Sequence, residues 1–252
     1  MKKPSLLWDG FFYFRIFGKS ISMKRIVILS GAGMSAESGI STFRDSNGLW
    51  QNHRIEEVAS PEAWQRNPAM VLEFYNQRRK QLFEVEPNEG HKALAKLESA
   101  YEVHIITQNV DDLHERAGST QVIHLHGELK KARSTVDPNL IYTLNHWELK
   151  LGDTCEKGSQ LRPHIVWFGE AVPLMDKAVS IAKTADIFMV VGTSMVVYPA
   201  AGLIHYVPDP VPKYYIDPKA FQVAGINHLE IIEQKAGEAL PKLVDKLLAM
   251  PS

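Results

Sequence analysis

The amino-acid sequence predicts an α/β fold with a doubly wound parallel sheet and a smaller domain made from two insertions. A continuous β-branched apolar run at residues 25–29 has the pattern of a strand buried on both faces, and it leads directly into a glycine-rich turn. Similar apolar runs follow along the chain, and helical patterns alternate with them. Strands separated by helical stretches form parallel sheets with helices on both faces.

Each predicted element follows from one of these two patterns. Short apolar runs predict strands at residues 25–29, 103–107, 122–125, 187–191, 214–216 and 229–232. Apolar residues at helical spacing predict helices at residues 68–83, 91–99, 111–117, 175–184, 198–206 and 237–250. Two stretches break the alternation. Residues 59–88 are expected to be mostly helical without a strand, and residues 128–161 to be polar and irregular.

The predicted domain organisation follows from these two stretches. A Rossmann-like domain is expected from residues 23–58, 89–127 and 162–252, and a small domain from residues 59–88 and 128–161. Residues 1–22 are expected to be an extension outside the fold, because Asp9 and Arg15 interrupt their apolar stretch and no cleavage site follows. A membrane or export role for them is the less favoured alternative, since the stretch is too short and too charged to span a bilayer.

Composition excludes several classes of protein. An apolar fraction of 45% and a charged fraction of 23% are those of a globular protein that buries a core. The formal charge of −1 shows no basic excess, so we expect neither a nucleic-acid nor a membrane partner. Cys155 is the single cysteine, so the chain cannot form an intrachain disulfide or a cysteine-rich zinc site, and a cytoplasmic location is expected.

The turn Gly31-Ala32-Gly33 follows the first predicted strand. Glycines at such a turn let the backbone approach a pyrophosphate, and the helix that follows offers free N–H groups. The turn lacks the full G-x-G-x-x-G pattern, so alone it is weak evidence for a dinucleotide site.

The segment from Gly31 to Trp50 reads GAGMSAESGISTFRDSNGLW, and it resembles the long signature of the sirtuins, the NAD-dependent protein deacylases. Blocks at residues 108–111 (QNVD), 126–127 (HG), 166–170 (VWFGE) and 192–194 (GTS) match in order and spacing. The resemblance covers residues 23–250 and implies NAD as the cofactor. The residues that it places against NAD are Gly31, Ala32, Gly33, Ser35, Ala36, Glu37, Thr42, Phe43, Arg44, Trp50, Gln108, Asn109, Asp111, Gly192, Thr193, Ser194, Asp217 and Ala236.

The resemblance also implies the reaction, in which the bond between nicotinamide and ribose is broken and the acyl group of a modified lysine passes to ADP-ribose. It assigns His126 as the general base, a role that suits a neutral imidazole near pH 7, and Asn109 as a second catalytic residue. His124 is expected to be a hydrogen-bonded structural histidine. For Asp111 two roles stay open, contact with ribose and capping of the helix that starts there.

A substrate site is predicted on the helix at residues 68–83. Tyr75 and Arg78 share a face with apolar residues, so Arg78 interrupts an apolar stripe, while Arg79 and Lys80 point elsewhere. A guanidinium in this position needs an anion. The anion is either a ligand carboxylate, with the Tyr75 hydroxyl as a second donor, or a nearby glutamate in an internal salt bridge.

The Tyr-x-x-Arg pattern resembles the class of sirtuins that removes succinyl and malonyl groups, whose bacterial members usually also remove acetyl groups. The resemblance therefore implies all three activities on acylated lysine in proteins. Ala59 matches the small residue that leaves room for the longer acyl chain. The remaining residues predicted to bind substrate lie in a block that could pair with an extended peptide by strand addition: Val166, Phe168 and Gly169.

The sequence departs from the sirtuin pattern at the zinc module, where most members hold a structural zinc ion with four cysteines. The places of those cysteines fall at Ser134, Asp137, Cys155 and Gly158. His146 and Asp153 could in principle substitute, but their spacing matches no usual zinc pattern. We therefore expect a chain without zinc, whose insertion at 128–161 is held by packing of Ile141, Tyr142, Leu144, Trp147 and Leu149.

Three other functions are less favoured. An enzyme that transfers ADP-ribose to protein or hydrolyses NAD would make no use of the Tyr75 and Arg78 pair. A module that only binds NAD or ADP-ribose would need neither His126 nor Asn109. A hydride-transferring dehydrogenase is the least favoured, because no acidic residue follows the glycine-rich turn at the usual distance.

Overall fold

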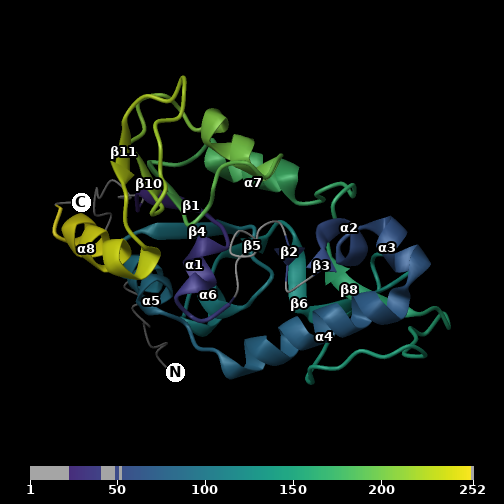
Figure 1. Ribbon diagram of the computed structural model, residues 1–252. Coiled ribbons are helices and arrows are strands. Elements are labelled where there is room, and N and C mark those ends of the chain that lie inside the picture. Colours follow the sequence, from purple (N-terminus) through teal and green to yellow (C-terminus); the bar gives the residue numbers. More distant parts are fainter. Residues whose placement is uncertain (1–22, 41–48, 51–52, 251–252) are drawn as a thin grey trace, which may run out of the picture.

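The structure is a computed structural model that describes residues 23–40, 49–50 and 53–250. Its centre is a six-stranded sheet in the order β11-β10-β9-β1-β4-β5, in which every neighbouring pair is parallel (Figure 1). The predicted doubly wound α/β fold is confirmed. The strands are β1 (Arg25–Ser30), β4 (Glu102–Thr107), β5 (Val122–His124), β9 (Ile187–Val191), β10 (Lys213–Ile216) and β11 (Leu229–Ile232).

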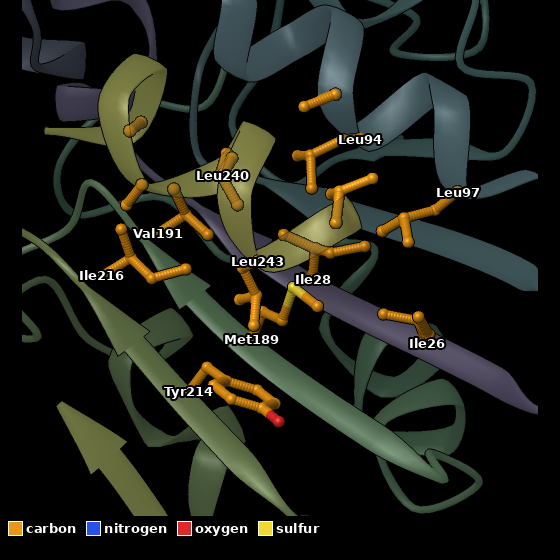
Figure 2. Close-up of a cluster of buried hydrophobic side chains, with 14 of the residues drawn as sticks. Ile26, Ile28, Leu94, Leu97, Met189, Val191, Tyr214, Ile216, Leu240 and Leu243 are labelled. Carbon is orange, nitrogen blue, oxygen red and sulfur yellow. The ribbon is translucent and has the colours of Figure 1, made fainter. Parts of the chain in front are cut away.

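Helices cover both faces of this sheet. The side chains of β1 point alternately to one face and the other, and both sets are buried under helices. Ile26 and Ile28 lie in the apolar cluster formed with α5 (Glu89–Lys96), η1 (Leu97–Ser99) and α8 (Ala236–Leu248). Figure 2 shows side chains of these helices, among them Leu94 and Leu243, gathered over the strands. Val27 and Leu29 face the opposite cluster, which contains residues of α7 (Met175–Ala182) and η2 (Ala200–Tyr206).

Two short helices follow strands of this sheet: α1 (Gly33–Ala36) comes after β1, and α6 (Leu113–Arg116) comes after β4. The remaining elements form a smaller module beside the sheet. In the module, a three-stranded antiparallel sheet has the order β7-β6-β8, and β2 pairs with β3. Its elements are β2 (Leu49–Trp50), β3 (His53–Arg54), α2 (Ile55–Val58), α3 (Pro61–Arg66), α4 (Pro68–Glu84), β6 (Gly127–Ser134), β7 (Ile141–Thr143) and β8 (Leu161–Ile165).

Two predictions of secondary structure are wrong. Residues 128–161, expected to be irregular, contain most of β6 and all of β7. The alternation of β6 is hidden in the sequence because the strand register shifts between Gly127 and Ala132, and because its partly exposed positions carry charged side chains. The helix expected at residues 198–206 is a 3-10 helix that begins only at Ala200.

Helix α4 is stabilised by an N-terminal cap and by burial of two of its faces. The Asn67 side chain accepts a hydrogen bond from the backbone N–H of Met70, and Pro68 occupies the first helical position. One face of α4 packs in an apolar cluster with β6, β8 and Trp167. A second face, marked by Leu72, packs in another cluster with the segment that follows β7.

Within the part of the chain that the structure describes, each helix falls short of the length or the apolar character that a transmembrane span requires.

Candidate active site

A cavity of about 570 Å³ opens at the carboxyl ends of β1, β4 and β9, between the parallel sheet and the smaller module. Strand β1 has β4 on one side and β9 on the other, so the strand order reverses there. Open α/β sheets bind their ligands at such a switch point. The cavity is also lined by residues of α4 and by the segment after β8.

Glycines form the floor of the cavity because two backbone loops touch there. The N–H of Gly33 donates to the carbonyl oxygen of Gly192, 2.8 Å away. A Cβ atom on Gly33 would lie 2.8 Å from Gly192 Cα, and one on Gly31 would lie 2.7 Å from Thr193 Cβ. Any side chain at Gly31 or Gly33 would therefore push the two loops apart and displace the backbone that forms the floor.

A buried polar network stands beside these loops. The Ser35 hydroxyl donates to Asp111 Oδ2 at 2.9 Å and accepts from Asn109 Nδ2 at 3.0 Å. Asp111 Oδ1 also accepts from the N–H of Leu113, the first residue of α6. The N-cap of α6 is Asp112, so Asp111 is not the capping residue that one of its two predicted roles requires, and it lines the cavity as well. Burial raises the pKa of its carboxyl group.

His126 lines the cavity after β5 with a defined arrangement of protons. Its Nδ1 lies 3.1 Å from the backbone carbonyl oxygen of Gln108. A carbonyl oxygen can only accept, so Nδ1 carries the hydrogen and Nε2 of the neutral ring keeps a lone pair. Burial lowers the pKa of His126 below its ordinary value. The neutral ring, which can act as a base, is therefore the favoured form.

The predicted acyl-binding residues meet at one end of the cavity. Ala59, Tyr75 and Arg78 all line it, and Tyr75 and Arg78 are buried. The indole N–H of Trp167 donates to the Tyr75 hydroxyl oxygen at 3.1 Å. Burial lowers the pKa of Arg78 to about 10.

Arg79 points away from the apolar stripe, as predicted, but not toward solvent. Its side chain is fully buried on the second face of α4. It donates to the carbonyl oxygens of Leu129 and Trp147 and to the side chain of Asn76. The second buried face of α4 could not be predicted from the spacing of apolar residues, because polar side chains such as Arg79 and Asn76 hold it in place.

Residues 31–199 match the sequence model of the Sir2 family, which is more than half of the chain. The chain belongs to the Sir2 family. A protein of Helicobacter pylori (strain ATCC 700392 / 26695) named NAD-dependent protein deacylase is 57% identical over 232 residues, which cover 91% of this chain and 100% of that protein. A protein of the same name from Bacteroides thetaiotaomicron is 52% identical over 234 residues, with coverage of 91% and 100%.

Solved structures of Sir2 homologues share the fold. A Sir2 homologue solved as an NAD complex is 42% identical, with a TM-score of 0.80 and coverage of 90% of both chains. A mutant Sir2 homologue solved as an ADP ribose complex is 41% identical, with a TM-score of 0.82 and coverage of 91% of this chain and 95% of that one.

The cavity of this Sir2 chain gathers many of the residues predicted from the sequence. Those that line it are Gly31, Ala32, Gly33, Ser35, Ala59, Tyr75, Arg78, Gln108, Asn109, Asp111, His126, Val166, Phe168, Gly169, Thr193 and Ser194. Thr42, Phe43 and Arg44 lie outside the described residues, as does the side chain of Trp50.

Other predicted cofactor residues lie away from this cavity. Glu37 accepts a hydrogen bond from the N–H of Gly237 at the start of α8, beside the buried Ala236. Asp217 is buried after β10 and accepts from the N–H of Lys219. Gly192 supports the glycine floor from beneath, and Ala36 is exposed at the end of α1.

Sequence reasoning did not assign several residues that line the cavity. Trp167 stands inside the VWFGE block, but only the structure shows that it lines the cavity and contacts Tyr75. The apolar wall has no sequence signal of its own, since it combines Ile40, Leu129, Ile165, Val196, Val197, Tyr198 and Pro199 from distant segments.

The places of the zinc cysteines lie together in the smaller module. The Cys155 thiol is 3.1 Å from the Ser159 hydroxyl and 3.4 Å from that of Ser134, and the two hydroxyls are 2.8 Å apart. Asp137 forms an ion pair with Lys157, in which carboxylate Oδ2 lies 2.8 Å from Nζ. Among the described residues, no three His, Cys, Asp or Glu side chains are grouped to hold a metal ion.

The packing predicted for this segment needs one correction. Leu144 and Leu149 are buried, but Ile141 is exposed. Ile141 lies on β7, an edge strand of the small sheet, where alternate side chains face solvent and only Tyr142 turns inward. The cluster is completed by residues that were not predicted, among them Leu72 and Leu161.

Proposed function

We propose that this Sir2-family chain is an NAD-dependent protein-lysine deacylase that removes succinyl, malonyl and acetyl groups from lysine side chains. The observation that carries this proposal is the composition of one cavity. A glycine floor, a half-buried imidazole at His126 and a buried guanidinium at Arg78 all line it.

The residues of the glycine floor fit NAD. Gly31 and Gly33 leave no room for a Cβ, so the backbone itself forms the surface that a pyrophosphate would approach. Gln108, Asn109 and Ser194 line the wall beside it and offer amide and hydroxyl groups to the ribose. NAD, when bound, supplies the ADP-ribose that receives the acyl group as nicotinamide leaves.

His126 acts as the general base. Its Nδ1 is committed to the Gln108 carbonyl oxygen, so Nε2 is the atom that accepts a proton from a hydroxyl group. The lowered pKa keeps Nε2 unprotonated near neutral pH. Asn109 is held by the Ser35 hydroxyl through its Nδ2 group, which leaves its side-chain oxygen available to orient the reacting groups.

The acyl end of the cavity suits a short dicarboxylic acyl group. Arg78 is buried and lines the cavity together with Ala59 and Tyr75, and a guanidinium can bind a carboxylate through two parallel N–H groups. The Tyr75 oxygen accepts a hydrogen bond from Trp167, so the hydrogen of the Tyr75 hydroxyl is left to donate to another group. Nothing in this arrangement obstructs an acetyl group, which is smaller, so deacetylation accompanies desuccinylation.

The substrate peptide would lie along the segment after β8. The N–H groups of Val166 and Phe168 donate to the carbonyl oxygens of His126 and Ala59 within the chain. The carbonyl oxygen of Trp167 accepts from the N–H of Glu170, so strand addition would use the carbonyl group of Val166 and the N–H of Gly169. Phe168, whose exposed fraction is 51%, offers an apolar surface at the same place.

We also propose that the fold needs no zinc. The thiol of Cys155 and the hydroxyls of Ser134 and Ser159 satisfy one another where other sirtuins hold the metal. The ion pair between Lys157 and Asp137 joins the two turns across which zinc would bind.

A comparison of substrates tests the proposed function. The purified chain is incubated with NAD and a peptide carrying acetyl-, malonyl- or succinyl-lysine, and the products are identified by mass spectrometry. We expect nicotinamide, free lysine peptide and O-acyl-ADP-ribose from each peptide. ADP-ribose attached to protein without loss of the acyl group would support an ADP-ribosyltransferase and contradict this proposal.

A further inference from the structure

We infer that Trp167 is a positioning residue for acyl selectivity: its indole N–H fixes the Tyr75 hydroxyl as a hydrogen-bond donor toward an acyl carboxylate. This inference rests on the proposed function and adds a residue to it. Trp167 follows β8 and is buried, and its Nε1 lies 3.1 Å from the Tyr75 hydroxyl oxygen.

The direction of this hydrogen bond follows from chemistry. An indole nitrogen can only donate, so the Tyr75 oxygen accepts from Trp167 and its own hydrogen must point elsewhere. Burial raises the pKa of Tyr75, so the phenol keeps that hydrogen at neutral pH. Tyr75 is therefore held as a donor, at the end of the cavity that Arg78 also lines.

The indole itself is held in place by charged groups of the small sheet. The guanidinium of Arg162 lies over the Trp167 ring, with its central carbon 3.3 Å from the ring centroid. Glu170 accepts from the backbone N–H of Trp167 at 2.8 Å and from Arg162 at 2.8 Å. Arg133 contacts the same carboxylate at 3.2 Å. This arrangement fixes the ring that in turn fixes the Tyr75 hydroxyl.

The effect of Trp167 depends on the charge of the acyl group. A succinyl carboxylate accepts hydrogen bonds strongly, whereas an acetyl methyl group accepts none. A Tyr75 hydroxyl that rotates freely would present its oxygen to the carboxylate for part of the time. Loss of the indole N–H should therefore weaken binding of succinyl substrates and leave the acetyl substrate comparatively unaffected.

A matched pair of variants tests this inference. Trp167→Phe removes the N–H and part of the ring, whereas Trp64→Phe makes the same change in a neighbouring ring, 5.9 Å from Trp167, that does not line the cavity. For Trp167→Phe we expect the ratio of succinyl to acetyl kcat/KM to fall about tenfold, through KM, as for the loss of one hydrogen bond to a charged group. Trp64→Phe should keep the wild-type ratio. Equal ratios in the two variants would overturn the inference.

A double-mutant cycle separates positioning from a general structural effect. If Trp167 acts through Tyr75, then Trp167→Phe should not lower the succinyl-to-acetyl ratio any further in a Tyr75→Phe background. Additive losses would mean that Trp167 acts independently of the hydroxyl, which contradicts the inference. If the wild-type chain fails to remove succinyl groups at all, the proposed function and the inference fall together.

A spectroscopic measurement on the wild-type chain gives an answer even if Trp167→Phe does not fold. The indole N–H resonance of Trp167 is assigned by its through-space contacts with the Tyr75 ring. A hydroxyl that donates to an anion becomes a better acceptor, so this resonance should move downfield when a succinyl-lysine peptide binds. It should stay in place with an acetyl-lysine peptide. The same response to both peptides would overturn the inference.

Discussion

His124 and Glu115 form an ion pair in which imidazole Nε2 lies 2.7 Å from carboxylate Oε1. Nδ1 of the same ring lies 3.1 Å from the backbone oxygen of Asn109, so both ring nitrogens face acceptors. Burial alone would lower the pKa of His124, but the hydrogen bond and charge of Glu115, with a further contribution from Glu128, raise it above the ordinary value. The ring that supports the backbone of Asn109 is therefore favoured in its charged form.

This ion pair predicts a dependence of stability on pH. The raised pKa of His124 gives a contribution that is complete below about pH 6.5 and is lost as pH rises through its folded-state pKa. The lowered pKa of Glu115 gives a contribution that is lost as pH falls through its own folded-state pKa. Glu115→Gln should lower the free energy of unfolding near pH 6 by about 1 kcal/mol or less, since solvent screens the partly exposed carboxylate. At about pH 9 the difference should nearly vanish.

Urea unfolding at the two pH values measures this difference. Glu86→Gln is the control, because Glu86 pairs with Arg116, which stays charged over the whole range. Its effect should be the same at both pH values. A Glu115→Gln effect that also does not change with pH would contradict the charged state of His124.

The proposed role of His126 as general base predicts both a mutational loss and a pH profile. His126→Ala should lower kcat at least about 100-fold, a loss typical of removing a general base. Because the pKa of His126 is lowered and the neutral ring is the active form, kcat/KM should fall on the acid side only below about pH 6.5. Rates measured from acid to neutral pH check this. A midpoint above that value would contradict the assignment. The control is His104→Gln, at a histidine of β4 that contacts Glu102, and it should change neither kcat nor the pH profile.

Arg78 and Arg79 are adjacent in sequence and both are buried, but Arg78 lines the cavity, whereas Arg79 bonds to backbone and side-chain oxygens of the smaller module. Arg78→Met should lower the ratio of succinyl to acetyl kcat/KM by about tenfold or more, because a charge-assisted pair with the acyl carboxylate is lost. Arg79→Met removes three hydrogen bonds within the smaller module and should lower the melting temperature instead. Its ratio of activities should match the wild type. A ratio that falls equally in both variants would remove the specific role of Arg78.

The glycine floor predicts a loss of NAD binding on adding one methyl group. The new Cβ in Gly33→Ala would lie 2.8 Å from a backbone atom of Gly192, so the two loops must separate. We expect KM for NAD to rise roughly tenfold or more, as a displaced binding loop would cause. Gly202→Ala is the control, since its Cβ would be no nearer than 3.8 Å to the atoms around it. Equal KM values for the two variants would show that the close approach is not needed.

The parallel sheet was predictable from the sequence because its strands are buried on both faces and therefore consist of unbroken apolar runs, such as residues 187–191. The residues proposed for the site at strand ends, such as Gln108 and His126, were predicted from the resemblance to the sirtuins, and both line the cavity. The small sheet was not, since a register shift in β6 masks its alternation. Contacts between distant segments were also out of reach. That Trp167 donates to Tyr75 depends on how β8 packs against α4, which no local pattern encodes.

The last prediction concerns the place where other sirtuins bind zinc. In a zinc site the loss of one thiolate ligand removes much of a binding free energy of roughly 10 kcal/mol or more, and the module unfolds. Here the thiol of Cys155 only exchanges hydrogen bonds with Ser134 and Ser159, and a serine in its place can make the same bonds. Cys155→Ser should therefore cost about 1 kcal/mol and keep full deacylation. Elemental analysis should find less than stoichiometric zinc in the wild type, and a chelator should leave its melting temperature unchanged. A melting temperature that falls on chelation, together with stoichiometric zinc, would show that the module does depend on the metal.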